Sequence, residues 1–418
     1  MSILVMKFGG TSVADLERIR NAAGKVKREV ENGHEVIVVV SAMAGRTNEL
    51  VGWVEKVSPL FDAREYDAVV SSGENVTAGL MALTLQEMGV PARSWQGWQV
   101  PVKTTDAHGA ARIVEIPREN IDAKFAEGMK VAVVAGFQGV GPDGRITTLG
   151  RGGSDTTAVA FAAAFAAERC DIYTDVDGIY TTDPRITHKA RKLEKISYEE
   201  MLELASLGAK VLQTRSVELA MRYKVRLQVR SSFSDEPGTL VCDEEEIMES
   251  RVVSGIAHSR DEAKFTLTDV EDRPGVAAAI FGPLAEAGVN VDMIVQNVAE
   301  DGRTDMTFSC PTNQVLRAEK ALEEAAARGD IAFDKMIRDE DVAKVSVVGI
   351  GMRSHAGVAA RMFEALAREG INIEVITTSE IKISVLVARK YMELAVQTLH
   401  DAFELDRIGG IETASEGP

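Results

Sequence analysis

The feature that most constrains the fold is an internal repeat in the C-terminal part of the chain. After about residue 262, Gly275-Val276-Ala277-Ala278 recurs as Gly357-Val358-Ala359-Ala360, and Gly288-Val289-Asn290-Val291 recurs as Gly370-Ile371-Asn372-Ile373. Each copy shows the order strand, helix, strand, strand, helix, which is typical of the ferredoxin-like β-α-β-β-α-β fold. Two copies of one small domain therefore follow a larger N-terminal region. Paired small domains attached to an enzyme commonly sense a ligand, although a duplication without function fits the same pattern.

The N-terminal region, up to about residue 240, alternates short β-branched runs with longer helical patterns. This alternation predicts βαβ units and a mostly parallel sheet. Glu35 to Val40, Val131 to Ala135 and Asp171 to Thr174 are such runs, and each ends in a polar loop of small residues with at least one glycine. Because ligands of open α/β sheets bind outside the carboxyl ends of the strands, we expect these loops to converge on one crevice.

The overall charge limits the class of partner. The 418 residues carry a formal charge of −17, which argues against nucleic acid or an anionic membrane surface as the main partner. Cys170, Cys242 and Cys310 are far apart and lack metal-binding spacing, so we expect neither a disulfide framework nor a zinc site. The longest apolar run, residues 158–167, is only half a bilayer span. We therefore expect no membrane segment, no targeting signal and a cytoplasmic location.

A first candidate phosphate site is Lys7-Phe8-Gly9-Gly10-Thr11-Ser12, directly after the apolar stretch Ile3 to Met6. A glycine pair lets the backbone approach an anion closely, and Lys7 supplies a positive charge. Thr11 or Ser12 is expected to cap the following helix, whose N-terminal amides face the same anion. A plain turn is the alternative, because glycines are common at turns.

A second glycine loop, Gly150-Arg151-Gly152-Gly153-Ser154-Asp155-Thr156-Thr157, precedes an alanine-rich helix expected at residues 158–167. It predicts a second capped helix N-terminus. Arg151 offers a planar fork for a carboxylate or phosphate, and Asp155 places an anion beside it for an ammonium group or for orientation. The alternative is a capping Ser154 with Arg151 and Asp155 as an exposed ion pair. Together with Lys7, the chain has two predicted anion sites.

One apparent dinucleotide motif is rejected. Gly139-Val140-Gly141-Pro142-Asp143-Gly144 fits GxGxxG, but Pro142-Asp143-Gly144 is typical of a turn. Residues 145–149 then predict a strand instead of the helix that such a site requires. The chain also contains no GxxxxGK[ST] segment, which excludes a P-loop fold.

A third loop, residues 174–185, concentrates three carboxylates, a tyrosine and an arginine after a strand. It is predicted to hold a nucleotide, with aspartates near magnesium and Tyr180 along the base; the alternative is a solvated loop with Asx turns. Ser71-Ser72-Gly73-Glu74 is expected to follow a strand and begin a helix, where Glu74 either compensates the helix dipole or binds an amine. Lys210, which follows a helical segment, is a lone basic residue and weak evidence by itself.

In combination and in this order, the segments Lys7–Ser12, Ser71–Glu74, Gly150–Asp155 and Thr174–Gly178, ahead of paired repeats, resemble the aspartate kinase family. The resemblance covers essentially the whole chain, and the combination is specific although each segment alone is not. It implies an α/β protein with an amino-acid kinase fold, a mostly parallel open sheet between helices, over residues 1–245. Two ferredoxin-like βαββαβ ACT domains are implied at residues 262–340 and 341–418. No homoserine dehydrogenase half follows, so the chain resembles the monofunctional form.

The resemblance implies that ATP with Mg²⁺ phosphorylates the β-carboxylate of L-aspartate, giving 4-phospho-L-aspartate, the first step toward lysine, threonine and methionine. That carboxylate is already ionised at pH 7, so no general base is needed and catalysis rests on alignment and charge neutralisation. No metal cage made of protein alone is expected, because magnesium arrives with the phosphates.

The resemblance also implies roles for individual residues. The implied catalytic contacts are Lys7 with the Gly9 and Gly10 amides at the phosphoryl group, Arg151 at the substrate α-carboxylate, Glu74 at its α-ammonium, and Asp155 orienting the reacting end. The implied aspartate pocket further includes Ser41, Thr47 and Ser154, and the implied ATP contacts include Thr174, Asp175, Tyr180, Asp183, Arg185 and Lys210.

For the repeats, the resemblance implies that effector amino acids, lysine or threonine or both, bind at interfaces between ACT domains. The first implied set is Asp272, Gly275, Ala277, Asn290, Asp292 and Gln296, with Asn372 and Ile373 across the interface. The second is Met352, His355, Val358, Ser379 and Glu380, where Glu380 suits a lysine side chain. Ordinary polarity of loops and strand ends is the alternative for these positions.

The expected assembly is a homo-oligomer, or a complex with a shorter regulatory chain that starts near Met248. Two other functions compete with the leading one. A kinase of the same fold with another acceptor, such as glutamate or N-acetylglutamate, shares the glycine loops. A non-catalytic amino-acid sensor with a structural ATP site shares the repeats, although Lys7, Arg151 and Asp155 argue against it.

Overall fold

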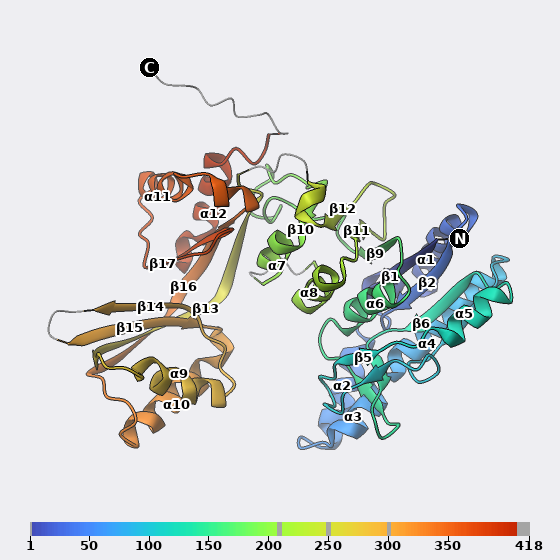
Figure 1. The fold of residues 1–418 in the computed structure, drawn as a ribbon, viewed down its shortest axis with the longest axis horizontal. Coiled ribbons are helices and arrows are strands. Elements are labelled where there is room, and N and C mark those ends of the chain that lie inside the picture. The colour runs from blue at the N-terminus through green and yellow to red at the C-terminus, as the bar shows by residue number, and fades with distance from the viewer. Residues whose placement is uncertain (1, 207–210, 248–251, 299–301, 408–418) are drawn as a thin grey trace. The chain divides into compact units, whose positions relative to one another are not determined.

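The computed structural model describes residues 2–206, 211–247, 252–298 and 302–407 (Figure 1). The chain forms two compact units. The first unit comprises Met1–Ile179 and Lys192–Glu249, and the second comprises Tyr180–Arg191 and Ser250–Pro418. Residues 180–191, which include the second half of the third loop, therefore belong to the same unit as the C-terminal residues.

The first unit alternates strands and helices over most of its length, as the sequence predicts. Its elements are β1 (Ile3–Phe8), η1 (Gly10–Val13), α1 (Leu16–Glu31), β2 (Glu35–Val40), α2 (Arg46–Val57), α3 (Ala63–Val70), α4 (Ser72–Glu87), β3 (Ala92–Trp95), β4 (Lys103–Thr104), β5 (Ile113–Glu115), α5 (Glu119–Ala126), β6 (Val131–Ala135), β7 (Gln138–Val140), β8 (Ile146–Thr148), α6 (Gly153–Ala164), β9 (Arg169–Thr174), β10 (Lys195–Ser197), α7 (Tyr198–Ser206), α8 (Thr214–Tyr223), β11 (Leu227–Ser231), β12 (Thr239–Cys242) and η2 (Glu244–Glu246).

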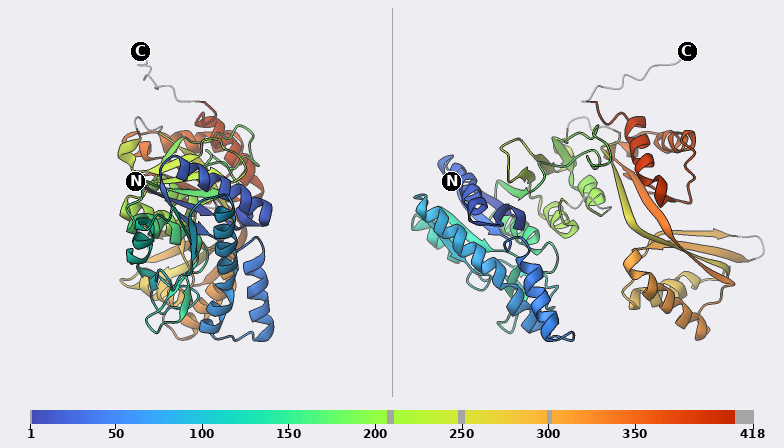
Figure 2. Two further views of the ribbon diagram at one scale, coloured as in Figure 1. Left: turned by 90° about the vertical axis from the view of Figure 1, so that its right-hand side faces the viewer. Right: turned by 180° about the vertical axis from the view of Figure 1, so that it is seen from behind.

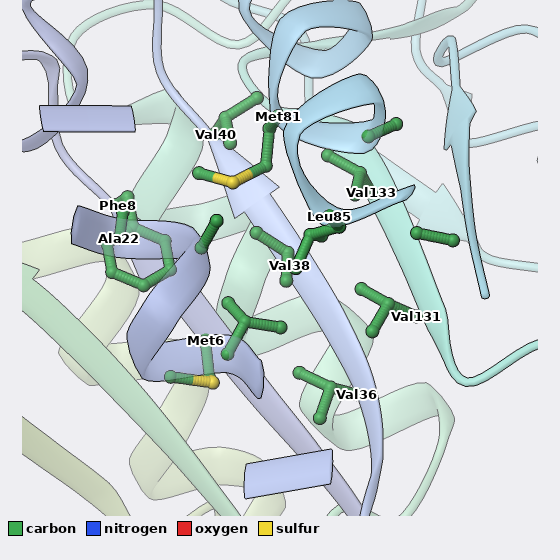
Figure 3. Close-up of a cluster of buried hydrophobic side chains, with 14 of the residues drawn as sticks. Met6, Phe8, Ala22, Val36, Val38, Val40, Met81, Leu85, Val131 and Val133 are labelled. Carbon is green, nitrogen blue, oxygen red and sulfur yellow. The ribbon is translucent and has the colours of Figure 1, made fainter. Parts of the chain in front are cut away.

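Eight of these strands form one sheet in the order β10-β12-β11-β9-β1-β2-β6-β3. All neighbours are parallel except β11 and β12, so the predicted mostly parallel sheet is confirmed. One face is covered by α1 and α4, and alternate side chains of β1, β2 and β6 pack there into a fully apolar core (Figure 3). Such burial on both faces explains why these strands read as continuous apolar runs.

The strand period places Lys7 on the opposite face of the sheet. Met6 and Phe8 point into the core beneath α1 and α4. Because successive side chains of a strand alternate between faces, Lys7 points to the side where α6 lies against β1, β2 and β9. A lysine in the apolar strand β1 is thereby directed away from the core.

A small second sheet with the order β5-β4-β7-β8 completes the first unit. β7 and β8 pair antiparallel around residues 141–145, with Gly139 opposite Thr147. The segment after the apparent GxGxxG motif is therefore a strand, and its rejection as a dinucleotide site is confirmed.

Two predicted helix caps are wrong, and so is the element predicted before a third helix, although that helix begins at Ser72 as expected. The helix α1 is capped by Asp15, whose Oδ1 accepts from Arg18 N (2.9 Å), and a four-residue 3₁₀ helix separates it from Gly9. Gly152 precedes α6 in a left-handed conformation and no side chain caps that helix. Ser71 follows helix α3 and not a strand. Tertiary contacts explain two of these differences, because the Ser12 hydroxyl contacts Ser232 and the Ser154 hydroxyl contacts Ser41.

The second unit contains the two repeats. Its elements are β13 (Gly255–Glu271), α9 (Val276–Glu286), β14 (Asp292–Val298), β15 (Arg303–Cys310), η3 (Thr312–Gln314), α10 (Val315–Ala327), β16 (Lys335–Val348), η4 (Ile350–Ser354), α11 (Val358–Arg368), β17 (Val375–Thr378), β18 (Lys382–Ala388), η5 (Arg389–Tyr391) and α12 (Met392–Ala402).

These strands form a six-stranded sheet in the order β14-β15-β13-β16-β18-β17. The long strands β13 and β16 run antiparallel side by side through both repeats (Figure 2). Residues 335–339 complete the first repeat, whereas residues 255–259, which precede it in sequence, supply the last strand of the second. Two ferredoxin-like domains are thus confirmed, and the second takes its last strand from residues that precede the first in sequence.

Candidate active site

Four loops leave the same edge of the large sheet. The adjacent strands β9, β1, β2 and β6 are mutually parallel, so their carboxyl ends lie side by side. Backbone hydrogen bonds join the loops to neighbouring strands, from Gly9 N to Tyr173 O (3.2 Å) and from Ser41 N to Phe8 O (3.1 Å). The predicted convergence of these loops is confirmed. The first residues after the four strands are Asp175, Gly9, Ser41 and Gly136.

The two predicted anion sites meet through Lys7 and Asp155. Lys7 Nζ lies 2.6 Å from Asp155 Oδ1, and the two side chains are 10% and 11% exposed. The atoms are in ionic contact, although their angles do not suit a hydrogen bond. A Cβ atom on Gly9 would lie 3.4 Å from Lys7 Nζ, so glycine leaves room beside the ammonium group. The alternative of an exposed Arg151–Asp155 pair is wrong, because Asp155 is buried against Lys7.

The loop after β2 is tied to the first turn of α6. The hydroxyl groups of Ser41 and Ser154 are 2.8 Å apart, which explains why Ser154 does not cap the helix. A Cβ atom on Gly10 would lie 3.0 Å from the Ala42 carbonyl oxygen, so the first glycine loop and this loop are also in contact. Thr47 lies in the first turn of α2, half-buried, a few residues further on.

Glu74 is the most distinctive group of this region. It is 3% exposed, and its Oε1 accepts from Ala42 N (3.0 Å), while Oε2 has no hydrogen-bond partner among the described residues. Burial raises the pKa of Glu74 to about 7, against the lowering effect of the Ala42 amide. A buried carboxylate oxygen without a partner is costly unless a ligand supplies a donor. Its burial favours the amine-binding alternative over simple compensation of the helix dipole.

Arg151 lies on a loop whose shape requires glycine. Gly150 and Gly152 have φ values of 76° and 72°, in the left-handed region that other residues rarely adopt. A Cβ atom on Gly152 would also come within 2.0 Å of the Gln213 side chain. Arg151 is exposed and makes no hydrogen bond or ion pair with the residues that the structure describes. Its guanidinium group is therefore available to an anionic ligand.

The predicted ATP contacts are divided between the two units. Thr174 and Asp175 end β9 in the first unit, where Thr174 Oγ1 donates to Asp175 Oδ1 (3.1 Å). Tyr180, Asp183 and Arg185 belong to the second unit.

In the second unit, the backbone NH of Arg185 donates to Asp183 Oδ1 (2.9 Å), and its side chain also binds this carboxylate and lowers the pKa of Asp183. This arrangement is an Asx turn, as expected for the alternative in which the third loop is a solvated loop with Asx turns. Lys210 lies outside the described residues.

Sequence reasoning missed Phe137, which follows β6. Phe137 has a φ of 69°, a conformation that is unfavourable for a bulky residue and that tends to occur at functional sites. Its backbone NH donates to Thr157 Oγ1 (3.1 Å), and its carbonyl oxygen accepts from Leu149 N (2.9 Å). It thus joins α6 to the strand that leads to Arg151. An aromatic residue between two glycines, Gly136 and the nearby Gly139, was the available signal.

In the first repeat, the predicted effector residues lie around α9 and the start of β14. Gln296 Nε2 donates to Asp272 Oδ1 (3.2 Å), which brings these two together. Gly275 precedes α9 with a φ of 93°, and Ala277 lies in its first turn. The backbone NH of Asn290 donates to Gln314 Oε1 (2.7 Å).

The two repeats exchange ion pairs at equivalent positions. Lys344 of β16 binds Asp292 of the first repeat (2.8 Å), and Lys264 of β13 binds Glu374 of the second. Met293 and Val375, at the starts of β14 and β17, share one apolar cluster. The stretch with Asn372 and Ile373 is therefore next to the stretch with Asn290 and Asp292, as the resemblance implies.

The second effector set lies around the start of α11. His355 Nδ1 is 2.8 Å from the Gly351 carbonyl oxygen, and Glu380 lies 3.4 Å from Arg353, which connects the β17–β18 turn to η4. Met352 belongs to η4, Val358 begins α11, and Ser379 N donates to Lys382 O (2.8 Å). The effector roles of both sets stay predictions.

The described residues show neither a metal-binding cluster nor a membrane-spanning helix. They contain no group of three His, Cys, Asp or Glu side chains that could hold a metal ion. None of their helices is long and apolar enough to cross a membrane. The three cysteines are unpaired and buried.

Comparison with known proteins identifies relatives along the whole chain. Residues 2–231 match the amino acid kinase family, and residues 265–327 and 345–403 each match the ACT domain. The chain is 56% identical to the aspartokinase of Pseudomonas aeruginosa, over 97% of this chain and 98% of that protein.

Solved structures show the same architecture. Aspartokinase III of E. coli, in complex with aspartate and ADP (R-state), is 30% identical, with a TM-score of 0.79 over 96% of this chain and 99% of its own. The same enzyme in complex with lysine and aspartate (T-state) is 29% identical, with a TM-score of 0.77 over the same shares of the two chains.

Proposed function

Because the chain belongs to the aspartokinase family, we propose that it transfers the γ-phosphoryl group of ATP to the β-carboxylate of L-aspartate and forms 4-phospho-L-aspartate. The chain is an aspartate kinase with two ACT domains. We further propose the roles of individual residues in this reaction and the amino acids that regulate it.

The observation that carries the proposal is the free oxygen of Glu74. Oε2 is buried without a partner among the described residues, beside an Oε1 that the Ala42 amide holds in place. An α-ammonium group would supply the missing donor and would lower the raised pKa of this carboxyl group. An acetylated acceptor such as N-acetylglutamate has no such group, so the geometry favours a free amino acid.

Lys7 is the proposed electrostatic catalyst. Asp155 holds its ammonium group at the end of β1, where Gly9 leaves room beside it. A cation that is fixed before the reaction stabilises charge that develops on the transferring phosphoryl group without reorganisation. The attacking β-carboxylate is already ionised, so no side chain has to remove a proton.

The other end of the aspartate molecule is assigned to Arg151. Its exposed guanidinium group suits the planar α-carboxylate by paired hydrogen bonds. Asp155 orients the reacting end through Lys7, and Ser41 and Ser154, already in mutual contact, line the same pocket. Thr47 is assigned to this pocket from the family resemblance.

The nucleotide is assigned to the loop after β9, with Thr174 and Asp175 in the first unit and Tyr180, Asp183 and Arg185 on the chain beyond it. Lys210 is assigned to ATP from the resemblance. Magnesium, when bound with ATP, neutralises phosphate charge. The exposed Asp175 carboxylate has the oxygen chemistry that this ion prefers, and most of its ligands would be phosphate oxygens and water.

Regulation is assigned to the ACT domains. Lysine is bound in the T-state complex of the E. coli enzyme, and we propose lysine, threonine or both as effectors of this chain, bound at the two residue sets described above. A place in lysine, threonine and methionine biosynthesis, a cytoplasmic location and a homo-oligomer are part of the same proposal. A shorter chain started near Met248, which lies outside the described residues, stays a prediction.

The decisive experiment is an assay of ADP formation with L-aspartate and MgATP, run with and without lysine and threonine. We expect turnover that depends on L-aspartate. Its absence under every effector condition contradicts the proposal and revives the non-catalytic sensor.

The variant Glu74→Gln tests the acceptor. Loss of the charged partner of an ammonium group is expected to raise the KM for aspartate by about ten- to a hundredfold and to leave the KM for ATP within about twofold. Glu87→Gln, at the other end of the same helix α4, is the matched control and should change neither value. Activity on N-acetylglutamate that survives in Glu74→Gln, with no activity on aspartate in the unmodified enzyme, supports the acetylated-acceptor alternative.

A further inference from the structure

The glycines of the loop that carries Arg151 pack closely against Gly109, Gln213 and Phe137, and the strand that leads into the loop also sets its position. Arg151 makes no hydrogen bond or ion pair with the described residues. The loop begins directly after Thr148, the last residue of β8, and Leu149. Whatever fixes these two residues also sets the direction in which Arg151 projects.

Asp67 of α3 holds Thr148 from one side. Its side chain is fully buried, and Oδ1 accepts from Thr148 Oγ1 (2.5 Å) and Gly109 N (3.1 Å). Oδ2 is 2.7 Å from His108 Nδ1. A buried carboxylate is tolerated only when such donors satisfy it, and hydrogen bonds to a charged acceptor are the strong ones. Asp67 therefore joins β8 and the loop with His108 and Gly109 into one block.

Arg215 of α8 holds the next residue from another side. Nη1 donates to Leu149 O (2.8 Å) and Nη2 donates to Ala111 O (2.9 Å). The planar fork thus spans the strand end and the neighbouring loop, while Ala111 N donates to Thr148 O (2.9 Å). Burial and the nearby Arg112 lower the pKa of Arg215.

We propose that Asp67 and Arg215 are positioning residues that align Arg151 with the α-carboxylate of aspartate. Neither is assigned a contact with substrate or with the phosphoryl group. The inference rests on the proposed function and adds to it two charged residues, far from each other in sequence, that brace the same two-residue stretch. A displacement of about 1 Å at such a site is enough to reduce a rate a hundredfold.

The test compares the KM for aspartate with the KM for ATP in Asp67→Asn and Arg215→Lys, measured on the full chain by ADP formation. Asp67→Asn keeps the shape but loses the charge and presents a donor to existing donors. Arg215→Lys keeps the charge but loses the fork. Each is expected to raise the KM for aspartate by about tenfold or more, with the KM for ATP within about twofold.

Asp62→Asn is the matched control, because Asp62 is an exposed carboxylate that caps the same helix α3 and pairs with Arg64. It should leave both KM values unchanged. A purely structural role predicts lower thermal stability with both KM values moved equally, or neither, and that result overturns the inference.

Thr148→Val removes a single hydrogen bond and serves if the charged variants fail to fold. A smaller rise in the KM for aspartate alone supports the inference, and an unchanged KM overturns it. If the unmodified enzyme itself forms no ADP with aspartate, the proposed function fails. The inference fails separately when the unmodified enzyme is active and the variants keep its KM for aspartate.

Discussion

The charged groups of the candidate site in the first unit differ from the charged groups between the repeats of the second unit. In the first unit, Glu74 is buried with one oxygen unpartnered among the described residues, and Arg151 is exposed without a protein partner. In the second unit, the buried Lys344 lies between Glu262 and Asp292, and Lys264 binds Glu374. At the candidate site of the first unit, these two groups are available to a ligand, whereas the buried charges between the two repeats of the second unit are paired with one another. Buried charges elsewhere in the first unit, such as Lys25 and Asp67, also have protein partners.

This difference distinguishes charged groups that are available to a ligand from charged groups that join two domains. An unpaired buried carboxylate lowers stability, so its presence at the ends of parallel strands points to a ligand. A buried lysine with two carboxylates satisfies itself and specifies how the repeats are joined. Burial lowers the pKa of Lys344, but Glu262 and Asp292 outweigh it and raise that pKa overall.

The largest expected effect is on kcat, when the charge of Lys7 at the candidate site is removed. Lys7→Ala should reduce kcat by about a hundred- to a thousandfold, with a much smaller change in the KM for aspartate, because the charge matters most as the phosphoryl group moves. Steady-state kinetics of ADP formation measure both. Intact kcat with weakened binding of both substrates would contradict this role.

Lys25→Ala is the control for Lys7→Ala. Lys25 is a similarly buried lysine of the first unit, 6% exposed and paired with Asp235 (2.8 Å). Its removal should lower stability and leave kcat within about twofold, since it lies outside the assigned site.

The variant Lys344→Met tests the paired charges between the two repeats of the second unit. It leaves Glu262 buried without its cation and should lower the free energy of unfolding of the second unit by about 3–5 kcal/mol. Amide hydrogen exchange of β16 and β18 measures this, because all three tryptophans, Trp53, Trp95 and Trp98, lie in the first unit.

A second substitution sharpens the Lys344 result. Adding Glu262→Leu should restore most of the loss, because an apolar replacement of both partners is often neutral. Lys335→Met, at a largely exposed lysine of the same strand, should stay within about 0.5 kcal/mol. Equal losses at positions 344 and 335 would refute a special role for the buried pair.

The smallest expected effect is a gain in stability. The pKa of Glu74 is about 7 in the folded state and 4.5 ordinarily, so the folded state holds its proton more tightly. The stability contribution of this group is present below pH 4.5 and is lost as the pH rises through 7, by about 3 kcal/mol in all. Glu74→Gln should therefore unfold at higher denaturant than the unmodified enzyme at pH 8 and equally at pH 4, as followed by tryptophan fluorescence. A difference that does not depend on pH would show that Glu74 is not buried as a raised-pKa acid.

Much of the fold could be predicted because its signals are local. Runs such as Glu35–Val40 and Val131–Ala135 are apolar throughout, since helices cover both faces of a parallel sheet, and the structure has them as β2 and β6. The contribution of a strand to the second repeat by residues that precede the first repeat could not be predicted. Residues 255–259 pair with residues 344–348 far along the chain, and their sequence carries no mark of that partner.

The sequence predicted which residues belong to the candidate site better than it predicted which of them contact one another. Lys7, Glu74 and Asp155 could be named from motifs, but a capping role for Ser154 or Ser12 was locally just as reasonable. Ser154 instead contacts Ser41, and Ser12 contacts Ser232, across 113 and 220 residues of chain. Asp67 and Arg215 belong to no recognisable motif, because their partners are backbone groups, a threonine and a histidine that lie far away in the sequence.

The sequence by itself determined the family, the two repeats and the positions of the glycine loops, because glycine pairs, strand periods and repeated segments act over a few residues. The tertiary structure alone decided which charges meet. Lys7 faces Asp155 because β1 lies at the centre of the sheet with α6 across its opposite face. Glu74 binds the Ala42 amide through one oxygen, and its other oxygen has no partner in the part of the chain that the structure describes. Long-range pairing and burial depend on how distant segments pack, and no short stretch of sequence contains that information.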